Sequence, residues 1–369
     1  MNNLLFTAVL FPLMTLPLLS HGAEKRVEEK WQRDRAPLLA NFNNMYNPCV
    51  VEVEGEYRYL MWFFGWANDH TNKEFPGCDA IYHARSKDLR RWEVYSGDNH
   101  WDKTMSPDLW VPVIHASDNW FEAWHTGDPS VTLKDGVFYM AYSATSKHFE
   151  PRAGFPAEMV QCVMGARSTD GVAWTKTEQP LLIRAEDTAN PPPTPGRIGD
   201  FHRPSLHWSD GKWRLWFDYW HPAKGVCMGY AENLGEFGAE RQFKIQHPLA
   251  EPMIANWPNP DVVRIGNRYH SFSDPAGYPI KEGESHWKGR QLREAVSSDG
   301  LTWQQLPFIK PDADVDACHV PQALLTTING KQWLYLFYAT QIGNRKRDGK
   351  YHYQYDQIRG MRREIEFRN

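Results

Sequence analysis

Five stretches of this chain share one pattern, in which a proline opens an alternating apolar and polar run that leads through a turn into an aromatic-rich run. The clearest is HTGDPSVTLKDGVFYMAY, which starts at His125 and ends at Tyr142. The alternation on both sides of Asp135-Gly136 predicts two strands joined by a tight turn. The stretch is therefore predicted to be a β-hairpin with polar residues at its open end.

The pattern repeats at irregular intervals, which indicates structural repeats. The five opening prolines are Pro48, Pro129, Pro204, Pro260 and Pro321. A second motif, a Ser/Asp/Gly turn before a tryptophan, occurs late in most units and suits an outer strand. Its clearest copies are Ser86 to Trp92, Ser168 to Trp174 and Ser298 to Trp303. Three or four strands per unit, repeated five times, predict an all-β fold, a five-bladed β-propeller.

The innermost strand of each blade lines the axis of a propeller, so residues just before it lie at one mouth of the channel. We therefore expect one polar residue from each unit to converge on a single pocket. These residues are Asn47, Asp128, His202, Asn259 and His319. The alternative for each residue is a turn-capping role beside its proline.

The predicted domain organisation has three parts. Residues 1–23 contain a short apolar run closed by small residues, which predicts a signal peptide and therefore a secreted or periplasmic protein. Residues 24–40 are charged and favour a short helix, which would lie on the side of the propeller or on a partner subunit and so allows a homodimer. Residues 41–369 are predicted to form the propeller, the catalytic domain.

The composition of the chain limits the classes of molecule that it is expected to bind. A net charge of -4 offers no basic surface for nucleic acid, and no later apolar stretch is long enough to span a membrane. The 17 Trp, 16 Tyr and 18 Phe suit both blade packing and stacking on sugar rings. The five cysteines show no metal-binding spacing; Cys49 and Cys318 lie at the same level of the first and last blades, where a disulfide would close the ring.

The proline-led hairpins and the Ser-x-Asp-Gly-x-x-Trp motifs resemble the five-bladed propeller glycoside hydrolases. That superfamily contains the arabinanases, levansucrases and invertases and includes glycoside hydrolase families 43, 32 and 117. The resemblance implies a carboxylate base or nucleophile at the start of blade one, a second Asp that tunes pKa values, and a general acid further round the ring. An exported glycosidase that acts on plant or algal oligosaccharides or polysaccharides would fit this resemblance.

The chain departs from the family pattern, because Asn47 cannot act as a base and no unit has the usual Glu-x-Pro acid. If the family pattern is read from blade two instead of blade one, the catalytic set is Asp128, Asp261 and His319. His319 stands where the family has its acid, and family 117 is similar in using a histidine. Asp261 either lines the pocket or points away from it, because side chains alternate along a strand.

Glycoside hydrolysis requires a proton donor and, on the other face of the sugar, a base or nucleophile. Asp128 would activate water, and His319 beside Asp316 or Asp261 would stay protonated near neutral pH and donate. Groups on opposite sides of a channel mouth favour inversion, and the proposed action is on terminal sugars. Arg203 suits a substrate carboxylate or sulfate.

The remaining candidates are assigned to substrate binding. They are Asn47, Trp124, His125, Asp200, His202, Arg203, His221 and Asn259. Asp200 is also an alternative acid or base. No cofactor is predicted, and the alternative is a metal ion held by His125, His202 and His319. The alternative function is a non-catalytic carbohydrate-binding propeller, which the missing blade-one acid favours.

Overall fold

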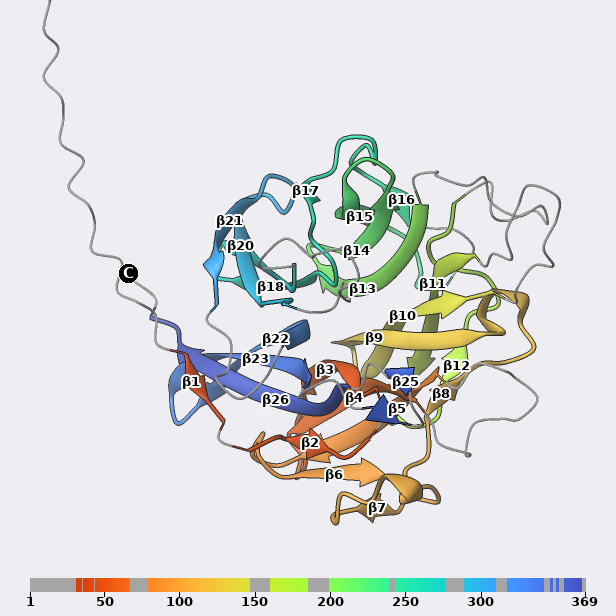
Figure 1. The fold of residues 1–369 in the computed structure, drawn as a ribbon, viewed down its shortest axis with the longest axis vertical. Helices are drawn as coiled ribbons and strands as arrows, with labels where there is room; N and C mark the ends of the chain where they lie inside the picture. Colours follow the sequence, from red (N-terminus) through yellow and green to blue (C-terminus); the bar gives the residue numbers. More distant parts are fainter. Residues whose placement is uncertain are drawn as a thin grey trace, which may run out of the picture. The chain divides into compact units, whose positions relative to one another are not determined.

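The computed structural model describes residues 31–34, 36–42, 44–66, 79–146, 160–184, 199–238, 243–275, 289–309, 317–341, 346–347, 350–351 and 355–366. From residue 31 onward the described chain forms five antiparallel sheets of four to six strands, one for each repeat, and one separate two-stranded sheet (Figure 1). The first strand of each sheet packs beside the first strand of the next, and the fifth lies beside the first. The five-bladed β-propeller is therefore confirmed. Residues 1–30, with the predicted signal peptide, lie outside the described residues.

Each blade runs outward in chain order from its innermost strand. Blade one contains β3 (Tyr46–Glu52), β4 (Tyr59–Trp66), β5 (Asp79–Ser86), β6 (Trp92–Tyr95) and β7 (Trp101–Asp102), with β8 (Ile114–His115) on β5. Blade two contains β9 (His125–Lys134), β10 (Val137–Thr145), β11 (Gln161–Ser168) and β12 (Thr175–Lys176). Two short 3-10 helices, η1 (Pro107–Leu109) and η2 (Trp120–Glu122), lie between β7 and β9.

The remaining blades follow the same order. Blade three contains β13 (Gly199–Ser209), β14 (Lys212–His221), β15 (Gly225–Asn233) and β16 (Lys244–Ile245), with β17 (Ile254–Ala255) on β15. Blade four contains β18 (Asp261–Ile265), β19 (Arg268–Ser273), β20 (Arg293–Ser297) and β21 (Gln304–Phe308). Blade five contains β22 (Ala317–Ile328), β23 (Lys331–Gln341) and β26 (Tyr355–Glu364). A separate hairpin pairs β24 (Lys346–Arg347) with β25 (Lys350–Tyr351).

The N-terminal part of the described chain completes blade five. Strands β1 (Gln32–Arg33) and β2 (Leu39–Ala40) pair with β26, with Gln32 opposite Arg362 and Leu39 opposite Ile358. The predicted helix at 24–40 is therefore not found where the chain is described: residues 24–30 lie outside the described residues, and β1 and β2 are extended because β26 offers an open edge for pairing.

A shared backbone distortion marks the start of every blade. The residue before each opening proline has a left-handed φ, between 44° and 51°; these residues are Asn47, Asp128, Arg203, Asn259 and Val320. Such a φ is uncommon for any residue except glycine, and it is an outlier for the β-branched Val320. The pairing register shifts at this point in β3, β9, β13 and β22. A bulge of this kind re-aims side chains, here at the same end of every inner strand.

One residue after each proline, the side chains form a closed ring of hydrogen bonds around the axis. Each side chain accepts a hydrogen bond from a backbone N–H of the following blade. The donor and acceptor pairs are Val131 N to Cys49 Sγ (3.2 Å), Leu206 N to Ser130 Oγ (2.8 Å), Val262 N to Ser205 Oγ (2.9 Å), Ala323 N to Asp261 Oδ2 (2.7 Å) and Val50 N to Gln322 Oε1 (3.0 Å). We call these five acceptors the axial ring.

The axial ring contains one cysteine, Cys49. Cys49 is a free thiol, so the disulfide considered between Cys49 and Cys318 is not formed. The Cys49 thiol instead occupies the ring position that serine occupies in blades two and three. Burial raises the pKa of this thiol to about 12, so it stays protonated and unreactive.

The turn motif before the outer strand takes the same form in three blades. Asp88, Asp170 and Asp299 each accept two backbone N–H hydrogen bonds from the residues that follow them. The serine of the blade-four copy is Ser297, one residue earlier than predicted. Trp62 and Trp216 donate to the carbonyl of Gly171 and of Gly300 in the next blade's turn, at 2.9 and 3.1 Å. The turns therefore join neighbouring blades as well as neighbouring strands.

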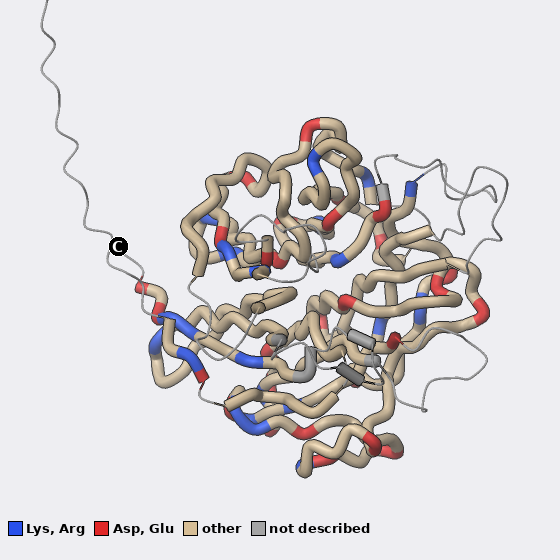
Figure 2. The backbone as a smooth tube through the Cα atoms, viewed as in Figure 1, with Lys and Arg blue, Asp and Glu red and all other residues tan. Residues whose placement is uncertain are grey.

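Charged residues of both signs are spread over the blades (Figure 2). In the described part of the chain, no helix combines the length and the apolar character needed to cross a membrane.

Candidate active site

Residues at the proline bulges of neighbouring blades lie close together: Asp128 of β9 is near His202 and Arg203 of β13. Asp128 is fully buried there, and neither of its carboxylate oxygens has a hydrogen-bond partner among the described residues. The Nδ1 atom of His202 lies 3.6 Å from Asp128 Oδ2, and the Nε atom of Arg203 lies 3.9 Å from it. Asp128 therefore has charged and polar neighbours without a direct hydrogen bond to them.

Two histidines flank this carboxylate. His125, the first residue of β9, hydrogen-bonds Asp79 through Nδ1. Burial lowers the pKa of His125, but the carboxylates of Asp79 and Asp128 outweigh that effect and raise it above its ordinary value. For His202, burial lowers the pKa well below its ordinary value, and the nearby Arg203 lowers it further, so this imidazole is neutral.

Arg203 joins Asp128 to the next blade. Its Nη1 atom lies 3.4 Å from Asp218 Oδ2, and its backbone N–H donates to Ser143 Oγ at 2.8 Å. Burial lowers the pKa of Arg203, but Asp218 and Asp128 raise it overall. The guanidinium of Arg203 therefore lies beside two carboxylates of the protein, whereas the sequence analysis assigned it to a carboxylate or sulfate of the substrate.

A second carboxylate, Asp274, organises the blade-four and blade-five side of the mouth. It is fully buried and contacts Arg290 Nη1 at 3.2 Å and His319 Nδ1 at 3.1 Å, and it also accepts a hydrogen bond from the side chain of Asn259. Burial raises the pKa of Asp274, but Arg290 and His319 hold it below its ordinary value overall. Asp274 is therefore an ionised acceptor.

His319 consequently differs from its predicted state. Its partner is Asp274, not Asp261, and Asp316 lies outside the described residues. Burial lowers the pKa of His319 to about 4, although Asp274 opposes this, so the imidazole is neutral at pH 7. The hydrogen bond to an ionised carboxylate places the proton of neutral His319 on Nδ1.

Asp261 lies in the axial ring and not among the groups that surround Asp128. Its Oδ1 accepts from Ser205 Oγ at 3.2 Å and its Oδ2 from Ala323 N at 2.7 Å. Burial raises the pKa of Asp261 to about 7. Of the two orientations left open by the sequence, the structure shows the one in which Asp261 holds three inner strands together.

The other predicted residues have varied surroundings. Asn47 donates its side-chain amide to the carbonyl of Pro129 at 3.1 Å, so it supports the backbone beside Asp128. His221, at the end of β14, accepts from Ala223 N at 3.1 Å and caps the following turn. Trp124 is half-buried directly before β9, and Asp200 is half-buried in β13 with a φ of 58°.

Sequence reasoning missed four charged residues of this site, Asp79, Asp218, Asp274 and Arg290. Asp218 and Asp274 end or interrupt aromatic second strands, WFDYW and SFSDP. An acid within an otherwise apolar strand is the signal that points to them, because a buried carboxylate requires partners. Asp79 and Arg290 carry no comparable signal in the sequence.

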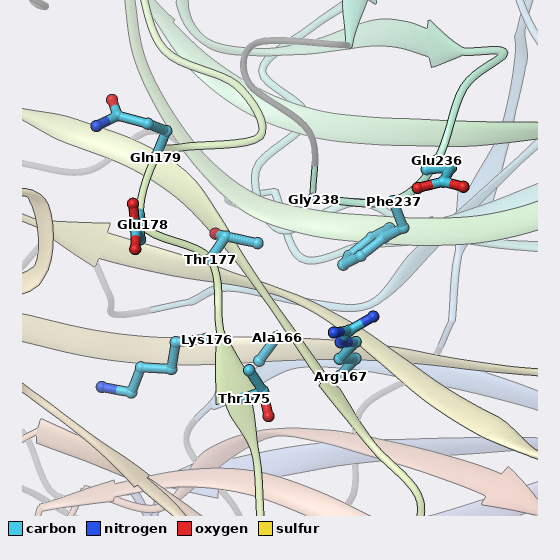
Figure 3. Close-up of a pocket in the computed structure, with 10 residues that line it drawn as sticks. All are labelled: Ala166, Arg167, Thr175, Lys176, Thr177, Glu178, Gln179, Glu236, Phe237 and Gly238. Carbon is cyan, nitrogen blue, oxygen red and sulfur yellow. The ribbon is translucent and has the colours of Figure 1, made fainter.

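A surface pocket of about 500 Å³ lies away from this site, between the outer strands of blade two and the turn after β15 (Figure 3). It is lined by Ala166, Arg167, Thr175, Lys176, Thr177, Glu178, Gln179, Glu236, Phe237 and Gly238. None of the predicted site residues lines it. The mouth instead gathers ligand-type atoms: those of His125, Asp128 and His202 all lie within 4.8 Å of one another.

The fold is similar to that of several glycoside hydrolase structures. The structure of a BT0996 RGII complex is 14% identical in sequence, with a TM-score of 0.60 over 93% of this chain and 94% of the other. Zg3597, a family 117 glycoside hydrolase from the marine bacterium Zobellia galactanivorans, is 14% identical, with a TM-score of 0.56 over 90% of this chain and 89% of the other. No protein-family model matches this sequence, and no curated protein sequence matches it either.

A larger enzyme contains the same architecture. The Bombyx mori GH32 beta-fructofuranosidase BmSUC1 is 14% identical, with a TM-score of 0.56 over 91% of this chain and 62% of the other. At these identities the likeness shows the fold. The chain is thus a five-bladed β-propeller of the kind found in glycoside hydrolase families 32, 43, 62 and 117, which confirms the resemblance seen in the sequence at the level of architecture.

Proposed function

We propose that this protein is a glycosidase in which Asp128 is the carboxylate that activates water or attacks the sugar. One observation carries the proposal: Asp128 is fully buried, yet both of its oxygens lack a hydrogen-bond partner among the described residues. Buried polar groups normally have partners, and a buried charge without one is costly. A carboxylate kept in this state at the mouth of a propeller is suited to pair with water or with a substrate.

The fold supports the reaction class, because structures of similar architecture include glycoside hydrolases of several families. Such reactions need a second group that protonates the leaving oxygen. We assign that role to His319, which lies on blade five and is oriented by Asp274. The Arg203 guanidinium lowers the pKa of His319 and lies 3.9 Å from Asp128 through its Nε atom, so it acts on both proposed reacting groups.

The state of His319 gives this assignment a distinct pH dependence. A pKa of about 4 means that its protonated fraction grows as the pH falls from 7 towards 4. If His319 is the acid, kcat/KM increases as the pH falls over this range. A rate that is flat between pH 5 and 7 would remove His319 from this role.

We further propose inversion, action on terminal sugars of plant or algal saccharides, and export. Inversion is proposed because Asp128 and His319 belong to blades two and five, which are not adjacent, and inverting enzymes keep their two catalytic groups far enough apart to hold a water molecule. A channel mouth encloses the end of a sugar chain more readily than its middle. Export follows from the apolar N-terminal run. Proton NMR of the first anomer released tests inversion directly.

The central experiment measures hydrolysis of a panel of chromogenic glycosides and plant and algal oligosaccharides. Asp128→Asn keeps the shape of the side chain and is expected to lower kcat/KM on any substrate found by about 10²–10⁴-fold. The matched control is Asp135→Asn in the turn of the same hairpin, where the side chain is exposed; its activity should equal that of the wild type. An active Asp128→Asn protein would overturn the proposal.

The second candidate is a non-catalytic carbohydrate-binding propeller. The observation in its favour is Asn47, which occupies the blade-one position of the family acid and uses its amide to hold Pro129. Calorimetry with the same oligosaccharides separates the two functions. Binding without any product, equal in the wild type and in Asp128→Asn, would support this candidate.

A further inference from the structure

Three buried side chains at the mouth bring ligand-type atoms to one point. His125, Asp128 and His202 are 9%, 0% and 8% exposed, and one ligand atom of each lies within 4.8 Å of the other two. All three belong to inner strands, β9 and β13, so the scaffold holds them in place. Their positions are therefore set by the blades themselves.

These atoms lack other partners. Both oxygens of Asp128, both ring nitrogens of His202 and Nε2 of His125 have no hydrogen-bond partner among the described residues. The 3.6 Å between His202 Nδ1 and Asp128 Oδ2 is too long for a hydrogen bond. It is close to the separation of about 3.3 Å between two ligands that each lie about 2.0–2.1 Å from a tetrahedral ion.

The surroundings of His125 are those of a metal ligand. Its Nδ1 atom hydrogen-bonds the carboxylate of Asp79, which leaves Nε2 as the nitrogen with a lone pair. Metal-binding histidines usually donate their other N–H to such a carboxylate, which fixes the tautomer and the ring orientation. Gly127 adds a steric requirement, because a Cβ there would lie 3.0 Å from His125 Nε2 and 2.3 Å from the Phe64 ring.

We propose that His125, Asp128 and His202 bind one divalent transition-metal ion, with further coordination positions open to water or to a ligand. Two imidazoles and one carboxylate suit Zn²⁺ or another first-row transition metal, whereas Ca²⁺ and Mg²⁺ prefer oxygen ligands. His319 does not belong to this set, because the ligand atoms that lie within 4.8 Å of one another come from His125, Asp128 and His202. The metal site therefore differs from the three-histidine site that the sequence allowed.

The metal site goes beyond the proposed function and stands on ligand geometry alone. A carboxylate that binds an ion through one oxygen keeps its second oxygen available, so both roles of Asp128 are compatible. Metal binding is also measured without any substrate. The two proposals can therefore fail separately.

The test uses the full chain without a histidine tag, freed of metal by a chelator and then titrated with Zn²⁺ or Co²⁺. We expect one ion per chain by elemental analysis, visible absorption bands from bound Co²⁺, and a higher melting temperature in the presence of Zn²⁺. His202→Gln and Asp128→Asn should each weaken Zn²⁺ binding by at least about 100-fold, and Asp79→Asn by about 10–100-fold.

The matched controls are His319→Gln, at the same mouth, and His115→Gln, on the surface; both should keep one ion per chain with unchanged affinity. A melting curve without metal shows whether each variant is folded. If a ligand variant fails to fold, the number of ions bound by the wild type and the affinity of Asp79→Asn for Zn²⁺ decide whether the metal site exists.

Absence of stoichiometric binding in the wild type, or loss of binding in His115→Gln, would overturn the metal site. One bound ion without hydrolysis of any substrate would leave the metal site standing and remove the proposed function. Hydrolysis by a protein that binds no ion would remove the metal site and leave the proposed function standing.

Discussion

Two layers of the propeller axis, one on each side of the opening prolines, use buried polar residues in opposite ways. In the axial ring, every side chain accepts a hydrogen bond from the next blade, as Asp261 does from Ala323. In the mouth layer, Asp128 is equally buried but its oxygens have no such partner among the described residues. The two aspartates stand one residue before and one residue after a proline. A buried acid with partners supports the fold, and a buried acid without them is available for chemistry.

The largest expected effect separates these two acids. Asp128→Ala should lower kcat/KM by about 10²–10⁴-fold and should change the free energy of unfolding less than Asp261→Ala does, because no hydrogen bond of Asp128 to a described residue is lost. Asp261→Ala should leave kcat/KM within a few-fold but lower the free energy of unfolding by about 1–3 kcal/mol, because the Ala323 N–H loses its acceptor. Urea denaturation and steady-state kinetics on both variants test the contrast. Equal losses of activity would break it.

The next effect concerns the space beside the mouth. Gly127→Ala should lower the free energy of unfolding by about 1–3 kcal/mol, because its Cβ overlaps the Phe64 ring. It should also displace His125 and so reduce activity. Gly136→Ala, in the turn of the same hairpin, meets no atom within 4 Å and has a φ of 75°. That variant should cost stability through backbone strain and leave activity unchanged, which thermal melts and kinetics will show.

The pH dependence of stability sharpens the comparison further. The pKa of Asp261 is about 7 in the folded protein and near 3.8 in the unfolded chain, so the folded state binds more protons between these values. Stability from this group therefore decreases as the pH rises from about 4 to about 7. Asp261→Asn should remove this contribution, so the difference in melting temperature between the variant and the wild type should shift in favour of the variant with rising pH. A constant difference would contradict the raised pKa.

The smallest effect is expected at Cys49. Serine holds the same ring position in blades two and three, so Cys49→Ser keeps an acceptor for Val131 N–H and should change the free energy of unfolding by no more than about 1 kcal/mol. Cys49→Val lacks the acceptor and should cost more. Reducing agent should leave the melting temperature of the wild type unchanged, because Cys49 forms no disulfide with Cys318.

The fold could be predicted from the sequence because each blade starts with the same local signal. Proline, a polar neighbour and an alternating run require no knowledge of distant contacts, and they correctly located all five inner strands. The strands that close blade five could not be found in this way. Residues 32–33 and 39–40 become strands because β26, more than 300 residues later, provides an edge.

The site was predictable only in part, for a similar reason. Asp128 and His202 were named as candidates because they stand one and two residues before their prolines. Asp261 was placed in the mouth, but a shift of one position along a strand moves a side chain to a different layer. His319 was found, but its partner Asp274 comes from the end of a neighbouring strand that carries no repeat signal. The lowered pKa of His319 depends on the burial of its side chain, which the sequence does not reveal.

The pairing of β1 with β26 has a consequence for synthesis. Arg362 and Gln32 are 330 residues apart in the chain, yet they hydrogen-bond in the last sheet. A ribosome delivers Gln32 early, but the edge that receives it is synthesised only 330 residues later. Contacts so distant in sequence form slowly, and the open partner surfaces remain exposed to other chains in the meantime. Completion of blade five is therefore the step at which a newly made chain either finishes folding or misfolds.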